Sequence, residues 1–393
     1  MSAGRTEVPK GDAVALTQAL TRIDSRNPTL APGAPGEGPI ASALSHILSA
    51  WGFDVTVANT ASGRPNVVAR IGPANTPAMM FAGHLDTVGV EGMTHPPFDA
   101  AIEGDRLYGR GSADMKSGVA AMCCAALAAF EECGSDAKRQ IVVAAVTDEE
   151  YESIGMLALI ATGVTAECAI LTEPTRLAIN PAHRGFVWME IEFTGRAAHG
   201  SRHDIGIDAI RHAGLVLAEL DELDAGKLRT RSHSLLGRGS LHASTISGGT
   251  GLSTYPDRCV LKVERRTIPG ETADDALREV DDALEAVRAR RPGLSATVRL
   301  IGAQLPSDVG VDAPVVKMLE RGLKAAGMPV AVEGMSAWTD AALLNEAGIT
   351  AICFGPGDIG LAHAAEEYVP VSEIRQATAV LTHVGREWMM ETA

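Results

Sequence analysis

The sequence predicts a mixed α/β protein in which a small domain is inserted into a larger one. Over residues 1–182 and 302–393, short apolar runs alternate with helix-like segments, which is typical of a mostly parallel sheet flanked by helices. Between residues 183 and 301 the runs instead alternate apolar and polar side chains, as strands with one wet face do. A chain of 393 residues is also long for one domain. We therefore expect a discontinuous larger domain (1–182 and 302–393) and an inserted domain (183–301).

In the larger domain, helical periodicity and Gly/Pro breaks define the expected elements. Helices are expected at Asp12–Ile23, Pro39–Trp51, Ala120–Glu132, Ile154–Ala161, Val315–Ala326 and Val371–Met389. Strands are expected at Val55–Ala58, Asn66–Ile71, Ala78–Ala82, Ile141–Val146, Ala169–Leu171 and Thr350–Phe354. Runs of Val and Ile without polar alternation predict strands that are covered on both faces.

The inserted domain has a different order of elements. Its expected strands are Val187–Phe193, Leu241–Ser247, Cys259–Arg265 and Ala296–Leu300, and its expected helices are Ile207–Leu223 and Ala273–Arg288. Read along the chain, the order is βαββαβ, which is that of a ferredoxin-like sandwich. About 115 residues are enough for such a domain to fold alone.

Composition and charge exclude several classes of protein. Apolar residues make up 46% of the chain and charged residues 21%, so the chain can bury a core. The net charge of −15 disfavours nucleic acid or an anionic membrane as a partner, and the longest apolar stretch, Gly118–Phe130, is too short to span a bilayer. The six cysteines form no Cys-x-x-Cys pair, which indicates reduced thiols in a cytoplasmic protein.

Chemistry-bearing residues gather just after the expected parallel strands, at the edge where open α/β sheets bind ligands. The clearest case is Gln140–Ser153, in which an apolar run ends in four carboxylates within the five residues from Asp148 to Glu152. Two carboxylates about 4 Å apart repel by roughly 4 kcal/mol at an effective dielectric constant near 20. Such a cluster is either a solvated helix start or is held together by positive charge.

Other turns at this edge contribute residues of the kind that bind metals. Together with one carboxylate from Asp148, Glu149 and Glu150, the candidates are His84, Asp114, Glu173 and His363. Two imidazoles and three carboxylates, one of them bridging, satisfy two zinc ions that keep open positions for water and substrate. The His-x-Asp spacing also allows Asp86 to orient the imidazole of His84.

Five motifs follow one another along the chain. They are Gly83-His-Leu-Asp-Thr-Val88, Gly109-Arg-Gly-Ser-Ala-Asp-Met-Lys-Ser-Gly118, Thr147-Asp-Glu-Glu150, Thr172-Glu-Pro174, and Gly355-Pro-Gly357 followed by Ala362-His-Ala364. By these motifs the chain resembles the M20 family of co-catalytic zinc amidohydrolases, which includes acetylornithine deacetylase, succinyl-diaminopimelate desuccinylase and glutamate-releasing carboxypeptidase. The resemblance covers nearly the whole chain, and it implies that the inserted domain is a lid and dimerisation domain.

The resemblance implies how the metal ligands are shared. His84 and Glu173 would bind one zinc ion, Glu150 and His363 the other, and Asp114 would bridge the two. The water between the two ions would be the nucleophile. Cobalt or manganese could use the same ligands.

The resemblance also implies catalytic and substrate-binding residues. Glu149 would be the general base, and Asp86 would orient the first imidazole. In the inserted domain, His199 would reach across a homodimer to polarise the scissile carbonyl, and Arg266 would bind a free carboxylate of a small-molecule substrate. Ser253 stands in the substrate-binding region where many relatives carry Asn, so the accepted acyl or amino-acid group stays open.

The expected function is hydrolysis of the amide bond of an N-acyl amino acid or a related small carboxylate-bearing amide, of deacetylase, desuccinylase or carboxypeptidase type. A dipeptidase or aminopeptidase on the same scaffold is the alternative, although such relatives commonly carry Asp at the position of Glu173. A metal-binding regulatory protein would be expected to have lost Glu149 or a ligand. A phosphoesterase would be expected to add a basic clamp, which the motifs lack.

Overall fold

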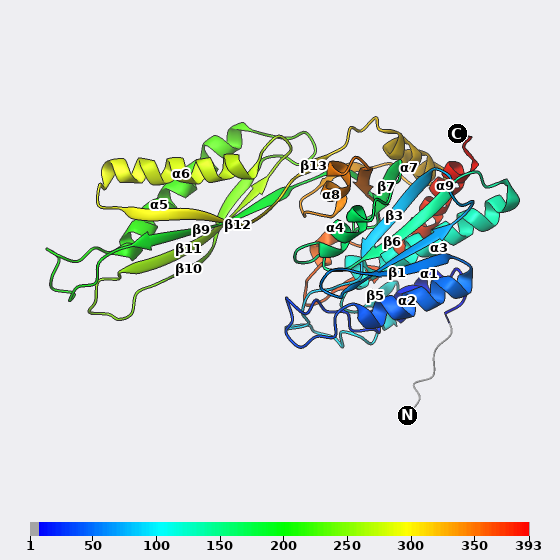
Figure 1. Ribbon diagram of the computed structural model, residues 1–393, viewed down its shortest axis with the longest axis horizontal. Coiled ribbons are helices and arrows are strands. Elements are labelled where there is room, and N and C mark those ends of the chain that lie inside the picture. Colours follow the sequence, from blue (N-terminus) through cyan, green and yellow to red (C-terminus); the bar gives the residue numbers. More distant parts are fainter. Residues whose placement is uncertain (1–7, 393) are drawn as a thin grey trace, which may run out of the picture. The chain divides into compact units, whose positions relative to one another are not determined.

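The computed structural model describes residues 8–392, so the extreme ends of the expected ranges 1–182 and 302–393 lie outside it. The described chain forms two compact units (Figure 1). Unit 1 contains the residues up to Pro181, Val309–Glu333 and the residues from Thr339 onward, and unit 2 contains Ala182–Asp308 and Gly334–Trp338. Unit 2 thus also includes residues 182, 302–308 and 334–338, which the sequence assigned to the larger domain.

A nine-stranded sheet contains the long strands of unit 1, in the order β1-β2-β6-β3-β7-β15-β8-β13 with β14 beside β8. The strands are β1 (Asp54–Asn59), β2 (Pro65–Ile71), β3 (Ala78–His84), β6 (Gln140–Val146), β7 (Cys168–Leu171), β8 (Ile179–His183), β13 (Ser307–Asp308), β14 (Val332–Met335) and β15 (Thr350–Cys353). The central strands β6, β3, β7 and β15 are parallel neighbours, and antiparallel strands extend the sheet on both sides. A separate three-stranded sheet joins β4 (Ile102–Glu103), β5 (Arg106–Tyr108) and β16 (Tyr368–Pro370).

Helices pack against the large sheet in two groups. They are α1 (Ala13–Thr21), α2 (Gly38–Trp51), α3 (Ser117–Cys133), α4 (Ile154–Ala161), α7 (Pro314–Ala325), α8 (Ala341–Glu346) and α9 (Val371–Met390). α1, α3, α7 and α9 pack against one another, whereas α4 contacts α8. The short turns η1 (Ser112–Lys116), η2 (Gly134–Asp136) and η4 (Ile359–Leu361) complete the unit.

The small side chains of α3 place it at the centre of the core. Its Ala, Cys and Met residues are almost all buried between the sheet and α9. At Gly118, a Cβ atom would lie 1.9 Å from the backbone oxygen of Thr172, so only glycine allows the helix to begin against the end of β7. Ser112–Asp136 is long and apolar enough to cross a membrane, but 89% of its most apolar window is buried inside the structure, which identifies a core helix.

Unit 2 has the ferredoxin-like order that the sequence predicts. Its elements are β9 (Gly185–Thr194), α5 (Ala209–Ala225), η3 (Lys227–Thr230), β10 (Ser240–Gly248), β11 (Arg258–Thr267), α6 (Ala273–Arg290) and β12 (Ser295–Gln304). The strands form an antiparallel sheet in the order β10-β11-β9-β12. α5 and α6 cover one face, where Val187, Met189 and Leu261 are buried. The predicted fold class is therefore confirmed.

Several short elements were not expected from the sequence. The missed strands are β4, β5, β8, β13, β14 and β16, and the missed helix is α8. Each has six residues or fewer, too few to show a clear period. In β8, Asn180 and Pro181 also disfavour a strand, yet Asn180 pairs with Cys353 of β15.

Candidate metal centre

Five segments bring the expected metal ligands to one edge of the sheet. β6, β3 and β7 are parallel, and their register brings their carboxyl ends to nearly the same level. The five candidates lie next to these ends: His84 ends β3, Glu150 follows β6, Glu173 follows β7, Asp114 precedes α3 and His363 follows β15. Ligand atoms of His84, Asp114 and Glu150 lie within 4.8 Å of one another.

Asp114 lies between the two imidazoles. Its Oδ1 is 3.0 Å from Nε2 of His84, and its Oδ2 is 3.7 Å from Nε2 of His363. The same nitrogen of His363 is 2.9 Å from Oε2 of Glu150. Two atoms that each lie about 2.1 Å from a tetrahedral zinc ion are about 3.4 Å apart, so these separations fit shared metal ligation. Asp114 thus presents one oxygen to each imidazole, as a bridging carboxylate requires.

The protonation behaviour of these groups also fits a cation. Burial lowers the pKa of His84, but its hydrogen bond with Asp114 and the charge of Glu149 raise that pKa well above its usual value overall. The hydrogen bond to Glu150 raises the pKa of His363 to about 9, and burial raises the pKa of Glu173 to about 8. Protons and a divalent cation compete for the same lone pairs, so this donor set suits a metal ion.

Asp86 supports the segments that carry the ligands. Its carboxylate accepts hydrogen bonds from the backbone N–H groups of Glu149 (3.1 Å) and Glu150 (3.2 Å) and from Nδ2 of Asn27 (2.9 Å). Nδ1 of His84 lies 3.0 Å from the backbone oxygen of Asp86 and 3.6 Å from its carboxylate. Because a carbonyl oxygen only accepts, Nδ1 carries the proton and Nε2 faces the other ligands. The nearer contact of Asp86 with His84 is therefore through its main chain.

The carboxylate of Glu149 lies beside the candidate ligands. Its Oε2 is 4.0 Å from Nε2 of His84, and its side chain is 11% exposed. Burial raises the pKa of Glu149 well above its usual value, with a further rise from the charge of Glu173, although His84 opposes the shift. A carboxylate with a raised pKa can hold a proton near neutral pH, which is the property of a general acid or base.

A buried ion network that the sequence did not reveal lies behind Asp86. Arg64 forms ion pairs with Glu37 and Asp148, and Nδ2 of Asn27 donates to Asp148 at 2.8 Å. Asn27 and Asp148 are 121 residues apart in sequence, so no local pattern reports their contact. The sequence marks Asn27 only as the start of a Pro/Gly-rich loop.

Glu367 is a second residue that the sequence did not single out, and it holds the turn that carries Asp114. Its carboxylate accepts hydrogen bonds from the backbone N–H groups of Gly111 (3.0 Å) and Asp114 (3.2 Å) and from Nη1 of Arg110 (2.7 Å). Glu367 follows His363 four residues later, in the same loop before β16. One loop therefore supplies a candidate ligand and the support for another.

The substrate-binding candidates lie in unit 2. His199 is exposed, and its Nδ1 is 2.8 Å from Oγ of Ser201. The backbone oxygen of Ser253 accepts a hydrogen bond from the N–H of Gly200 at 2.7 Å, and His199 forms a β-bridge with Thr254. The structure therefore brings His199 and Ser253 together, on two adjoining loops beyond the strands.

Arg266 lies near the other end of β11, on the sheet face opposite the helices. It forms an ion pair with Glu264 through Nε, and its side chain is 32% exposed. Its Cζ lies 5.6 Å from the ring centroid of Phe186, within the range of a cation–π contact. A guanidinium has five N–H donors, so one ion pair leaves donors for a second carboxylate.

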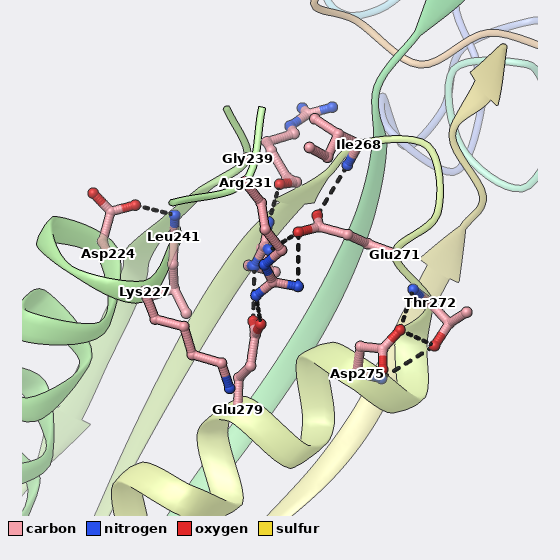
Figure 2. Close-up of polar contacts among 12 residues, drawn as sticks. Asp224, Lys227, Arg231, Gly239, Leu241, Ile268, Glu271, Thr272, Asp275 and Glu279 are labelled. Carbon is pink, nitrogen blue, oxygen red and sulfur yellow. Dashed lines mark hydrogen bonds and ion pairs between the residues drawn. The ribbon is translucent and has the colours of Figure 1, made fainter. Parts of the chain in front are cut away.

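A buried ion network around the carboxylates of Glu271 and Glu279 fixes the end of β11, and Figure 2 shows these carboxylates with Arg231. Arg265 points to the helical face, where Nη2 donates to Glu271 at 2.8 Å and Nε donates to Glu279 at 3.1 Å. Nη1 of Arg265 donates to the backbone oxygen of Arg266. Arg231 forms ion pairs with both of the same carboxylates. The network therefore joins β11 to α6 directly behind Arg266.

At the carboxyl edge of a parallel sheet, the buried imidazole of His84 and several carboxylates lie beside the exposed imidazole of His363 and a carboxylate with a raised pKa. Such an arrangement defines the site of a metal-dependent hydrolase. The chain belongs to Peptidase family M20/M25/M40, whose family model matches residues 80–387. It is a hydrolase of this family, of amidohydrolase or peptidase type, and the resemblance seen in the motifs is confirmed.

Curated relatives cover most of the chain. It is 33% identical to an acetylornithine deacetylase of Myxococcus xanthus over 323 residues, which cover 77% of this chain and 78% of that one. It is 30% identical to a putative succinyl-diaminopimelate desuccinylase of Mycobacterium tuberculosis over 378 residues, which cover 95% of this chain and 97% of that one.

Solved structures share the fold at lower identity. A tripeptidase of Staphylococcus aureus superposes with a TM-score of 0.81 at 18% identity, covering 98% of this chain and all of that one. A dinuclear metal-binding peptidase of the M20 family from Bacillus subtilis superposes with a TM-score of 0.70 at 14% identity, covering 96% of this chain and 97% of that one.

Proposed function

We propose that the protein hydrolyses the amide bond of N-acyl amino acids or related small amides that carry a free carboxylate. The observation that carries the proposal is the position of Asp114, whose two oxygens face the imidazoles of His84 and His363. One carboxylate between two imidazoles suits a pair of metal ions better than a single ion.

The ligands divide into two sets around Asp114. His84 and Glu173 would hold one zinc ion, and Glu150 and His363 would hold the other. Cobalt or manganese would also suit these donors. When bound, the two ions would polarise the amide carbonyl and make water more acidic.

Glu149 is the general base of the proposed reaction. Its backbone is held by the carboxylate of Asp86, and its own carboxylate lies 4.0 Å from Nε2 of His84, next to the reacting atoms. It would take a proton from the attacking water and deliver it to the leaving nitrogen. Burial raises its pKa, so the proton can be kept between the two steps.

Arg266 binds the carboxylate of the substrate in this proposal, because a guanidinium can form two parallel hydrogen bonds with a carboxylate. The Arg265 network fixes the strand end that carries it. Because this backbone is already rigid, little backbone conformational entropy is lost when the substrate binds.

His199 would polarise the scissile carbonyl from a second subunit. It lies beyond the Arg258 end of β11, whereas Arg266 lies near the Thr267 end. The eight residue-to-residue steps from position 258 to position 266 span about 27 Å of strand, so a small amide cannot reach both side chains of one subunit. We therefore propose a homodimer formed through unit 2. A cytoplasmic location is also part of the proposal, and it fits the six cysteines, which are all buried and free.

The proposal is tested by separating the roles of two adjacent residues. Glu149→Gln should keep about two metal ions per chain and lose about 10²–10⁴-fold in turnover of N-acyl amino acids. Glu150→Gln should also lose metal, because it removes a candidate ligand. Metal analysis by mass spectrometry and kcat on N-acetyl amino acids measure both effects. A metal-depleted Glu149→Gln beside a fully loaded Glu150→Gln would reverse the assignment.

A further inference from the structure

Unit 2 carries a group of three aromatic side chains that lie together outside its core, and we call them the aromatic surface: Phe186, Trp188 and Trp338. Aromatic residues make up only 4% of the chain, yet two of its four tryptophans are here. The other two, Trp51 and Trp388, are buried in the core of unit 1. Packing of a core therefore explains Trp51 and Trp388 but leaves the aromatic surface unexplained.

The position of these rings follows from strand alternation. Val187 and Met189 of β9 point into the core under α5 and α6, so Phe186 and Trp188 lie on the open face of the sheet. Their ring centroids are 4.4 Å apart in a stacked arrangement, and Trp188 is 36% exposed. Trp338 meets Phe186 edge-on at 6.2 Å.

Two hydrogen-bonded features hold the aromatic surface in place. Nε1 of Trp338 donates to the backbone oxygen of Leu305 at 3.1 Å. Phe186 and Trp188 lie within the continuous ladder between β9 and β11. Rings that are fixed before a ligand arrives lose little freedom when it binds.

Arg266 links the aromatic surface to the proposed carboxylate site. It is the register partner of Phe186, and its guanidinium lies 5.6 Å from that ring. A carboxylate bound to this guanidinium would hold its α-carbon next to Phe186 and Trp188. Aromatic rings pair favourably at centroid separations of about 4.5–7 Å, so a ring on that α-carbon's side chain has partners within reach.

We propose that the aromatic surface is a subsite for the aromatic side chain of the amino acid that carries the substrate's free carboxylate. The inference rests on the proposed function and narrows the substrate class to N-acylated aromatic α-amino acids. The carboxylate and the N-acyl group are different substituents of the α-carbon. When the carboxylate binds Arg266, the acyl group therefore points away from Arg266.

The charges around the aromatic surface disfavour a cationic side chain. Arg184 lies close enough for the charge of Arg266 to lower its pKa, in addition to the larger effect of its own burial. Glu264 is already paired with Arg266. A side-chain ammonium, such as that of acetylornithine, would be repelled by the guanidinium groups of Arg184 and Arg266. An uncharged ring has no charge to be desolvated or repelled.

Binding can be measured without turnover in the metal-loaded Glu149→Gln protein. We expect N-acetyl-L-phenylalanine to bind at least about 10-fold more tightly than N-acetyl-L-alanine or N-acetyl-L-ornithine by calorimetry. In the double variant Glu149→Gln/Trp188→Ala, the preference for phenylalanine over alanine should fall to within about 3-fold, while the Kd of N-acetyl-L-alanine stays within about 2-fold. Trp51→Phe in the same background is the matched control and should leave the preference unchanged.

The outcomes separate this inference from the proposed function. Equal binding of the phenylalanine and alanine ligands would overturn the aromatic subsite. So would an equal loss for both ligands in the Trp188 variant, because that result describes a structural role. If the wild-type protein hydrolyses N-acetyl-L-alanine and N-acetyl-L-phenylalanine with equal kcat/KM, the subsite is refuted and the proposed function stands. If the metal-loaded protein hydrolyses no carboxylate-bearing amide, the proposed function fails, and preferential binding of the phenylalanine ligand would still support the subsite.

Discussion

Replacing the buried Arg265 should lower the free energy of unfolding of unit 2 far more than replacing an exposed arginine of the same strand. Arg265 is 1% exposed, and its partners Glu271 and Glu279 are 6% and 4% exposed. Arg265→Met keeps most of the side-chain volume but leaves Arg231 as the one guanidinium paired with these two carboxylates. Breaking a buried ion pair in this way costs about 3–5 kcal/mol. The variant should therefore unfold at a clearly lower temperature.

The matched control is Arg258→Met, at the start of the same strand. Arg258 pairs with Glu192 on the surface, where the two side chains are 62% and 42% exposed. An exposed pair contributes about 0–1 kcal/mol. For a domain the size of unit 2, each kcal/mol shifts Tm by roughly 3–6 °C, so Arg265→Met should lose about 10–30 °C and Arg258→Met at most about 6 °C. Differential scanning calorimetry of the full chain measures both. Equal shifts in the two variants would refute the argument that burial makes the network important.

Two further predictions concern the substrate and the second subunit. Replacing the free carboxylate of an N-acetyl amino acid by a primary amide should cost about 10²-fold or more in kcat/KM, because the charged hydrogen bonds to Arg266 are lost; equal turnover of acid and amide would point to a different anchor. Mixing inactive Glu149→Gln protein with inactive His199→Ala protein should restore activity once subunits exchange, because one site then combines an intact base with an intact His199. No recovery after demonstrated exchange would place His199 in its own subunit's site or outside catalysis.

The fold could be predicted from the sequence because its long elements have clear periods. The run Gln140–Val146 and the small-residue helix α3 each show their burial in composition alone. The order βαββαβ of unit 2 follows from alternation such as that in Val187–Phe193. Elements of two to six residues, such as β13 and α8, gain their stability from partners distant in the sequence, so local patterns do not reveal them.

The candidate ligands could be predicted for a related reason. Four of them stand at or within a few residues of the end of a strand or the start of a helix that is itself predictable, so the position of the element also gives the position of the ligand. His363 lies further along the loop after β15, and the resemblance to the family indicated it. Supporting residues lack that relation. Asn27 reaches Asp86 across 59 residues of sequence, and Glu367 reaches the turn of Asp114 across 253. Such contacts depend on the tertiary fold, and single-sequence reasoning has no access to them.

The clustered carboxylates of Asp148, Glu149 and Glu150 lie in different environments. Asp148 faces inward to Arg64 and Asn27, so a guanidinium and an amide provide for its charge within the protein. Glu150 meets His363. Among the residues that the structure describes, the carboxylate of Glu149 forms one ionic contact, with the imidazole of His84 at 4.0 Å, and burial raises its pKa. Glu149, whose charge is least compensated, is thus the residue that we propose moves protons. Asp148, which is paired with Arg64 and Asn27, has a structural role. This difference in environment, rather than the residue type, separates chemically similar neighbours into distinct roles.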